Sequence, residues 1–406
     1  MPGATDTTIP TYSPLARFGS AHFWALAGLG ALVVLVGLGA AHHMETSGHV
    51  VTGMNNHVVW GLPHVFAVFL IVAASGALNV ASIGSVFGKS VYKARAPLSG
   101  LLCIAMLAGG LMVLMLDLGR PDRLVVAATH YNFKSVFAWN VFLYSGMFGI
   151  VAVYLWMLME KRFSPLSKPI GLLAFVWRLI LTTGTGSIFG FLVARQAYQS
   201  AVIAPMFIVM SFAWGLAAFY IVQTAMYGWN ALELDVATQR RLRNLLGVFV
   251  AGSLYFVAVY HLTNLYFARQ DGFERFLLLD GGIYTRMFWL GYVLVGSVLP
   301  LALIYLRPFG GARATLVAAG ATLLGALAFM YAFIIGGQAY PLDLFPGREV
   351  SSSFLDGAIS PYTPSLPELL LGIGGVGAAF LVTIIGVRLF GFVPADDPTA
   401  STGTDD

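Results

Sequence analysis

The sequence predicts an all-α polytopic membrane protein with ten transmembrane helices. Hydrophobic residues make up 58% of the 406 residues and charged residues only 10%, whereas a soluble domain carries roughly a quarter charged residues. Apolar runs of about 19 to 26 residues recur along the whole chain, and a helix needs about 20 such residues to cross the hydrocarbon core of a bilayer. Hydrocarbon is therefore the main solvent of this chain.

The first apolar run begins at Phe23, after a tail, residues 1–22, in which Arg17 is the only lysine or arginine. This run is long enough to span the membrane and has no convincing cleavage site, so we expect it to be retained as a helix. The other nine runs satisfy their backbone hydrogen bonds best as helices rich in Leu, Val, Ala, Gly and Phe. The predicted spans are 23–41, 58–82, 97–116, 134–158, 170–193, 203–228, 245–267, 286–306, 314–335 and 366–391.

Lysine and arginine are distributed unequally between the two sides of the membrane. Alternate loops place thirteen of them on one side and eight on the other, which predicts that both termini lie in the cytoplasm of a bacterial inner membrane. The cations are scattered singly, so we interpret the net charge of +4 as a topology signal and exclude nucleic acid as a partner. The lipid bilayer is the expected environment, and the long outer loops offer places for a protein partner to dock.

Cysteine and histidine usage argues against a metal centre in this chain. The single cysteine, Cys103, lies in an apolar run, so neither a disulfide, a cysteine cluster for iron and sulfur, nor a c-type haem attachment is expected. A membrane cytochrome b needs facing pairs of histidines, and only His64 and His261 among the eight histidines lie at predicted membrane depth. We therefore expect no haem and no metal here, and place any redox centres in other subunits.

The outer end of the second span combines Asn56, Trp60 and His64. Trp60 and His64 are four residues apart and would share one helix face, with His64 about 9 Å inside the outer boundary. An imidazole at this depth can hydrogen-bond a quinone carbonyl or accept a proton from a quinol hydroxyl. The alternative is an interfacial tryptophan belt beside a histidine that is bonded to a neighbouring helix.

A second polar group lies between the third and fourth spans. Asp117 and Arg120 are three residues apart, and we expect them to form an ion pair at the helix end that orders the loop. Tyr131, close to Trp139, could supply a second hydrogen bond to a quinone head group, although tyrosines are also common in the interfacial belt.

The third group lies deeper. Arg178 is near the middle of the fifth span, and an ionisable residue at that depth is a functional hypothesis by default. No span contains a central Asp or Glu as its partner, so backbone carbonyls, Asn140, Gln223 or a water-filled cavity are the alternatives. His261, near the outer end of the seventh span, lies at the depth of His64 and is a further candidate contact for a quinone.

Two other classes of function stay open. A secondary transporter would fit many helices and a lone intramembrane arginine, but no predicted span is broken at mid-depth and the polar groups gather at the outer face. A membrane anchor without quinone chemistry predicts that no quinone binds.

Several segments together resemble the NrfD/PsrC family, whose polysulfide reductase members are membrane subunits of redox complexes. The similarity covers about residues 20–390, and ten spans make the chain similar to the larger subgroup found in Hyb-type hydrogenase, Hmc, Tmc and Dsr complexes, with the serine-rich outer loop closest to DsrP-like members. The segments that resemble the family are Trp60-Gly61 with His64, and residues 117–121, 336–338, 351–354 and 362–368.

The resemblance implies a fold and a set of partners. It implies two four-helix bundles, residues 58–193 with the quinone site and residues 194–335, flanked by residues 23–57 and by the last span, 366–391. An outer loop, 336–365, precedes that span and a cytoplasmic tail, 392–406, follows it. Partners implied are a ferredoxin-like iron–sulfur subunit at the outer face and other subunits of a membrane redox complex, such as a cytochrome, molybdoenzyme-like or sulfur-metabolism subunits.

The resemblance also implies a reaction. The substrate would be a quinone or quinol, either menaquinone or ubiquinone, and this chain would be a subunit of a quinone-linked oxidoreductase rather than a stand-alone enzyme. His64 matches the quinone-bonding histidine of the family and Tyr131 is a candidate for its tyrosine partner. Gly61 stands where polysulfide reductase relatives have an asparagine, so Trp60 or Asn56 would replace that contact. In this mechanism His64 accepts a proton as electrons leave for the iron–sulfur partner, and Arg178 stabilises charge or lines a wet path deeper in the bundle.

Overall fold

The fold is described from a computed structural model of the full chain. The structure describes residues 12–13, 20–229, 234–306, 311–343, 345, 348, 350, 356–390 and 392–394. Most of the two predicted tails and the serines at 351–353 lie outside these residues.

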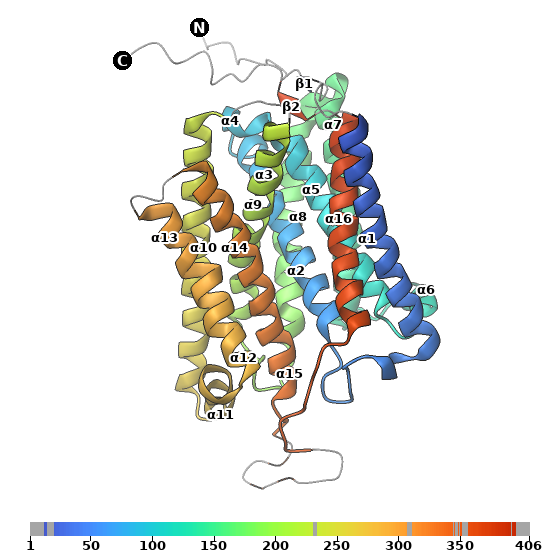
Figure 1. Ribbon diagram of the computed structural model, residues 1–406, viewed down its shortest axis with the longest axis vertical. Helices are drawn as coiled ribbons and strands as arrows, with labels where there is room; N and C mark the ends of the chain where they lie inside the picture. Colours follow the sequence, from blue (N-terminus) through green and yellow to red (C-terminus); the bar gives the residue numbers. More distant parts are fainter. Residues whose placement is uncertain are drawn as a thin grey trace.

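Within the described residues, ten helical segments are long and apolar enough to cross a membrane, which confirms the predicted number of spans and the all-α membrane fold (Figure 1). Three of them consist of two or three consecutive helical pieces. The spans are α1 (Ser20–Ser47), α2 (Leu62–Ala77) with α3 (Asn79–Ser85), α5 (Ala96–Leu116), α7 (Val136–Met159), α8 (Ser167–Gly190), α9 (Ile203–Trp229), α10 (Val236–Tyr266), α12 (Ile283–Arg286) with η5 (Met287–Val298) and α13 (Leu299–Tyr305), α14 (Ala312–Met330) with η6 (Tyr331–Gly336) and α15 (Gly337–Ala339), and α16 (Leu366–Phe390).

Short elements connect the spans. They are η1 (His49–Val51), α4 (Ser90–Lys93), η2 (Pro121–Arg123), α6 (Leu124–Thr129), η3 (Lys161–Leu166), α11 (Asp271–Arg275) and η4 (Phe276–Asp280), with two-residue strands β1 (Tyr12–Ser13) and β2 (Val393–Pro394) near the chain ends.

Several helices begin or end away from the predicted boundaries because a helix can continue past the hydrocarbon with polar residues. Helix α1 runs six residues beyond its predicted end at residue 41. Helix α10 begins at Val236 instead of 245, because the side chain of Asp235 caps it by accepting a hydrogen bond from the Thr238 amide, 2.8 Å away. Helix α2 begins only at Leu62, so Trp60 precedes the helix and His64 lies in its first turn, nearer the outer boundary than predicted.

The helix contacts form two closed groups. Helix α2 packs on α5 and α8, and α7 joins α5 to α8; in the second half, α9 packs on α10 and α14, and α13 lies between α10 and α14. We interpret these groups as two four-helix bundles that meet where α2 contacts α9. The two flanking helices, α1 and α16, pack against each other, and α16 covers α5 and α2 (Figure 1). Both flanking helices therefore lie on the side of the first bundle.

The second span is interrupted at Leu78, which lies nearer to its end at Ser85 than to its start at Leu62. Helix α2 ends at Ala77, and Ser99 of α5 inserts into the gap by donating to the Ala77 carbonyl at 2.6 Å and accepting from the Ala81 amide at 3.1 Å. A side chain that takes over the helical ladder in this way is a usual cause of a helix break. Two further spans contain π-helical turns, at η5 and η6.

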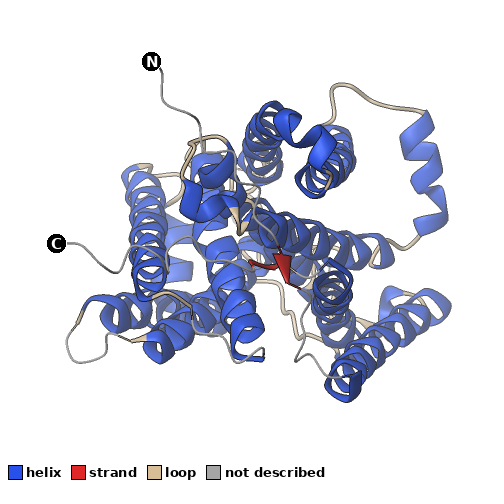
Figure 2. Ribbon diagram, turned by 90° about the horizontal axis from the view of Figure 1, so that it is seen from above, coloured by secondary structure: helices blue, strands red, loops and turns tan. Residues whose placement is uncertain are grey.

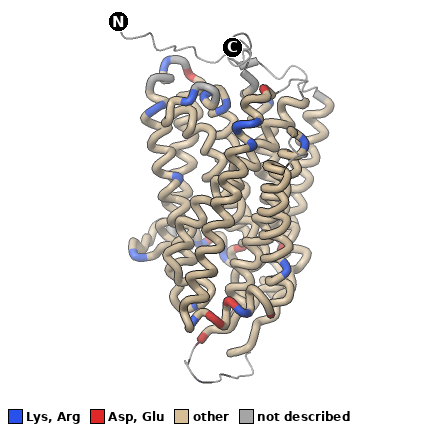
Figure 3. The backbone as a smooth tube through the Cα atoms, turned by 90° about the vertical axis from the view of Figure 1, so that its left-hand side faces the viewer, with Lys and Arg blue, Asp and Glu red and all other residues tan. Residues whose placement is uncertain are grey.

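Both described chain ends lie on the same side of the helices. Strands β1 and β2 pair antiparallel there, next to α4 (Figures 1 and 2). Lysine and arginine gather at this end of the molecule, whereas acidic residues are prominent at the other end (Figure 3). The arrangement agrees with the predicted alternation of loops, and the assignment of this end to the cytoplasm stays a prediction.

Candidate functional site

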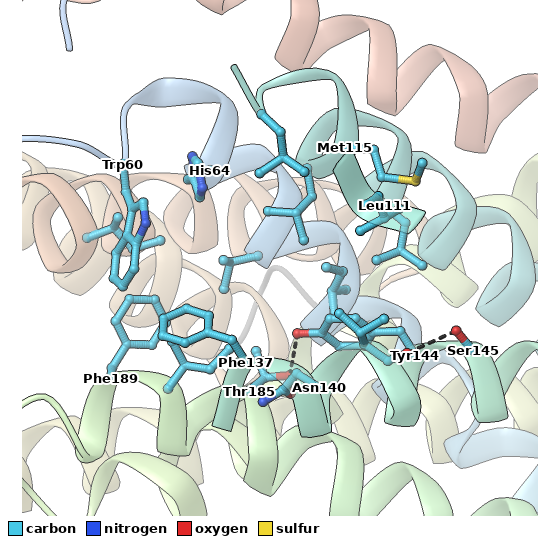
Figure 4. A pocket seen from close by; sticks show the side chains of 18 residues that line it. Trp60, His64, Leu111, Met115, Phe137, Asn140, Tyr144, Ser145, Thr185 and Phe189 are labelled. Atoms are coloured by element: carbon cyan, nitrogen blue, oxygen red, sulfur yellow. Dashed lines mark hydrogen bonds between the residues drawn. The ribbon is translucent and has the colours of Figure 1, made fainter. Parts of the chain in front are cut away.

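A cavity of about 390 Å³ opens among α2, α5, α7 and α8, near the end of the helices at which α2 begins and α5 ends (Figure 4). Most of its wall is apolar. The lining residues are Trp60, His64, Val68, Ile71, Leu111, Leu114, Met115, Leu118, Leu124, Phe137, Asn140, Val141, Tyr144, Ser145, Thr185, Ile188, Phe189 and Ile334.

One side of the cavity faces the surroundings of the helices. Met115 and Leu118 at the end of α5, and Phe137 and Val141 on α7, line the cavity and are each between 37% and 47% exposed. In a membrane these exposed apolar side chains contact lipid. This wall of the cavity is therefore the one nearest to lipid.

His64 and Asp117 form a buried pair at the wall of this cavity. Nδ1 of His64 lies 2.7 Å from Oδ2 of Asp117, whose side chain is only 1% exposed. Neither carboxylate oxygen makes another hydrogen bond within the described residues. A carboxylate beside Nδ1 favours the proton on that nitrogen, which leaves Nε2 of His64 for a ligand, and it stabilises the ring when both nitrogens are protonated.

The predicted ion pair between Asp117 and Arg120 is wrong. Arg120 instead binds Asp122, with both of its bonds to that carboxylate at 3.0 Å. Asp117 follows the last residue of α5 and turns into the bundle, whereas Arg120 lies beyond the helix and is 61% exposed. The residue spacing was right for a helix, but the helix ends before it reaches Arg120.

The segment before α2 places Trp60 over His64. Their rings stack with centroids 6.0 Å apart and planes 25° from parallel. Gly61 precedes the helix at a point where a side chain would lie 2.4 Å from Oε1 of Glu368, so the close approach requires glycine. Pro63 occupies the first turn, where its missing N–H costs nothing.

Glu368 anchors this segment from the first turn of α16. Its carboxylate accepts from the amides of Gly53 and Ser365 at 2.9 and 2.7 Å and from the Tyr362 hydroxyl at 2.8 Å. Burial and the nearby Glu368 carboxylate raise the pKa of Tyr362. The phenol therefore stays protonated and donates to the carboxylate, while it accepts from the amide of Leu62.

A second polar group lies across the cavity from His64 (Figure 4). The hydroxyl groups of Tyr144 and Thr185 are 3.3 Å apart, and Thr185 lies 3.5 Å from the side-chain oxygen of Asn140. The Asn140 amide nitrogen donates to the carbonyls of Val136 and Gly184, which fixes its orientation. Sequence reasoning missed this group as a site, although Asn140 and Tyr144 share one face of α7 at a spacing of four.

Four residues predicted to contact a quinone do not line the cavity: His261, described below, and Asn56, Tyr131 and Trp139. The Tyr131 hydroxyl donates to the Ala138 carbonyl, and the Trp139 indole N–H donates to the Phe133 carbonyl at 2.8 Å. Asn56 is exposed in the loop before α2. The structure thus shows Tyr131 and Trp139 packed together beside the start of α7, and a direct role for these residues in quinone binding stays a prediction.

Arg178 lies in the bundle interior, away from the cavity lining. Its guanidinium lies 5.0 Å from the ring centroids of both Phe175 and Phe212, and donates to the Ser75 carbonyl at 3.3 Å, near the break in the second span. Nε has no hydrogen-bond partner within the described residues. Of the partners considered from the sequence, a backbone carbonyl is the one observed.

His261 is bonded to a carboxylate in the second bundle. Nδ1 of His261 lies 2.6 Å from Oε2 of Glu274, and Asn264 donates to the other oxygen of Glu274 at 2.7 Å. Glu274 is fully buried although it lies outside the spans, in α11, which is why the sequence did not reveal this pair. His261 does not line the cavity.

Comparison with known proteins identifies the family. The sequence profile described as polysulphide reductase, NrfD matches residues 50–341 of this chain. The chain belongs to the NrfD family. This confirms the resemblance seen in the sequence, and the matched region contains the entire cavity lining.

Curated relatives of this NrfD-family chain include membrane subunits of redox enzymes. An Hdr-like menaquinol oxidoreductase integral membrane subunit of Archaeoglobus fulgidus is 30% identical over 84% of this chain and 87% of its own length. A putative dimethyl sulfoxide reductase membrane subunit of Halobacterium salinarum is 27% identical over 99% and 98%. A polysulfide reductase subunit of Wolinella succinogenes is 24% identical over 70% and 96%. These names support a role for this chain as a membrane redox subunit.

Proposed function

We propose that the chain binds a quinol from the bilayer in the cavity beside His64 and passes its electrons to an iron–sulfur subunit at the face opposite the termini. The observation that carries the proposal is the pair formed by His64 and the buried Asp117 in the wall of an apolar cavity, part of whose lining is exposed. Apolar walls with a few fixed polar groups are the usual form of a site for a hydrophobic ligand. The menaquinol named for one relative favours a naphthoquinol as the substrate.

The protein groups handle protons, while the quinol supplies the redox chemistry. We propose that Nε2 of His64 accepts a proton from one quinol hydroxyl and that Asp117 stabilises the resulting imidazolium. The second hydroxyl would bond to the group formed by Tyr144, Thr185 and Asn140. Oxidation of the quinol releases two protons and two electrons, so both protons must leave as the electrons pass to the partner.

Arg178 has a different proposed role, because it does not reach the cavity lining. Its charge is buried and forms no ion pair with a carboxylate in the described part of the chain. A buried charge without a counter-charge is costly. We propose that it stabilises negative charge or orders water near the break in the second span when protons move.

Binding of a quinol analogue to the purified full chain tests the proposal. We expect saturable binding of a short-chain naphthoquinol, weakened by about tenfold or more in His64→Ala and Asp117→Asn, because each removes a charge-assisted hydrogen bond. His43→Ala is the matched control, since His43 is exposed and its imidazole bonds only to the Ser47 hydroxyl within the described residues. Equal affinity in all four proteins would reject this site, and absence of binding would favour the anchor.

A further inference from the structure

Gln338 belongs to the segment 336–338 that resembles the family, yet the proton chemistry at His64 does not use it. It lies in α15, immediately after the π-helical segment η6 and in the half of the chain that forms the second bundle. Its side chain is 2% exposed. This part of the chain nevertheless reaches the quinone cavity of the first bundle, because Ile334 of η6 lines that cavity.

The side chain of Gln338 forms hydrogen bonds with both the amide and the carbonyl of Trp60. Its side-chain oxygen accepts from the amides of Val59 and Trp60, both at 3.0 Å, and its side-chain nitrogen donates to the Trp60 carbonyl at 2.9 Å. The same nitrogen donates to the Ile334 carbonyl at 2.9 Å. A carboxamide has two acceptor sites and two N–H donors, so this side chain is fully used.

Two residues from the loop between α8 and α9 hold this contact in place. Arg195 donates to the carbonyls of Gln338 and His57, each at 2.7 Å, and so ties α15 to the loop that contains Trp60. The Tyr198 hydroxyl donates to the Ile334 carbonyl at 2.8 Å. Position 337 favours glycine, because the Cβ of any other residue would lie 2.9 Å from the Tyr198 ring.

We infer that Gln338 is a positioning residue for the quinone site, supplied by the second half of the chain. The indole of Trp60 stacks on His64 and lies edge-on to Phe189, with centroids 5.6 Å apart, so it forms the roof of the cavity. Trp60 lies outside α2, and no helical hydrogen bonding fixes its backbone. Gln338 replaces that constraint. The inference rests on the proposed function of the cavity.

Loss of the Gln338 carboxamide releases the backbone of Trp60 but removes no group that lines the cavity. Replacement of Gln338 leaves the amides of Val59 and Trp60 without their acceptor. The segment then gains other conformations, and ligand binding must offset the entropy of ordering it, so affinity falls.

The test compares Gln338→Met and Gln338→Glu in the full chain with Gln270→Met. Gln270 is a matched control because it is also a buried glutamine near this end of the bundle, but within the described residues its side chain makes only one long bond, 3.4 Å, to the Gln196 carbonyl. Three quantities are measured: the Kd of a short-chain naphthoquinol by equilibrium dialysis, the melting temperature, and the emission of Trp60, obtained as the difference between each protein and the same protein with Trp60→Phe.

We expect Gln338→Met to bind about tenfold more weakly than wild type, with red-shifted Trp60 emission. Gln270→Met should keep the wild-type affinity and the wild-type Trp60 emission, and the melting temperatures show that both variants are folded. Gln338→Glu keeps the acceptor bonds to Val59 and Trp60 but loses both donated bonds, to the Trp60 and Ile334 carbonyls. Its affinity is therefore also expected to fall, and this variant decides the matter if Gln338→Met does not fold. Unchanged affinity and emission in both variants, with wild type binding normally, would overturn the inference. No binding by wild type would instead reject the proposed function, while the Trp60 emission still reports on the contact.

Discussion

At the scale of single residues, the environment of each polar group decides its role. His64 and His261 both lie beside buried carboxylates, yet only His64 borders the cavity. A histidine–carboxylate pair without access to substrate can order two helices but cannot exchange a proton with a quinol. The two histidines differ in whether they border the cavity, whereas the depth in the membrane predicted from the sequence was the same for both.

Arg178 provides a prediction at this scale. We expect Arg178→Leu to lower quinol turnover and proton uptake in the assembled complex while leaving the melting temperature within a few degrees of wild type. The reason is that one hydrogen bond and two ring contacts do not offset the burial of an unpaired cation. Thermal unfolding of the purified chain and turnover in proteoliposomes measure the two effects. Unchanged turnover and proton uptake would remove Arg178 from the mechanism, and a large loss of stability would make its role structural.

At the scale of elements, small residues allow helices from different bundles to touch. Gly76 of α2 faces the backbone of Ser211 in α9 so closely that a side chain on it would overlap the Ser211 carbonyl. The contact lies just before the break in the second span. The sequence suggested close packing from its many glycines, but it did not show which glycine joins which helices.

We expect Gly76→Ala to destabilise the protein by about 2 kcal/mol, because two backbones must separate to admit one methyl group. Gly149→Ala is the matched control. Gly149 is also helical, but nothing lies within 4 Å of its added carbon, so we expect a change within about 0.5 kcal/mol. Thermal unfolding in detergent measures both variants. Equal stability of the two variants would contradict the close contact between α2 and α9.

At the scale of the whole molecule, orientation follows from charge. The end that carries α4 and both chain ends is rich in lysine and arginine, and the cavity lies near the other end (Figures 1 and 3). If the basic end faces the cytoplasm, the proposed quinol site lies near the outer face of the membrane.

Accessibility of single cysteines tests this orientation. In a Cys103→Ser background, we expect Val50→Cys, which is 88% exposed near the cavity end, to react with a membrane-impermeant maleimide in intact cells. Lys89→Cys, exposed beside α4 at the opposite end, should react only after the membrane is opened. Cys103 itself is buried, so the wild-type chain should not react in either case. The reverse pattern would invert the topology and place the quinol site toward the cytoplasm.

The sequence by itself determined the ten spans and the absence of a carboxylate from the middle of any span, and it singled out His64 as a candidate, because the cost of polar groups in hydrocarbon shows in composition and spacing. Only the tertiary structure decided that Asp117 pairs with His64 rather than with Arg120, that Tyr144 and Thr185 lie across the cavity, and that Gln338 binds Trp60 from 278 residues away. Periodicity reports which face of a helix is apolar. It carries no information on which faces meet, because that depends on how all ten helices pack together.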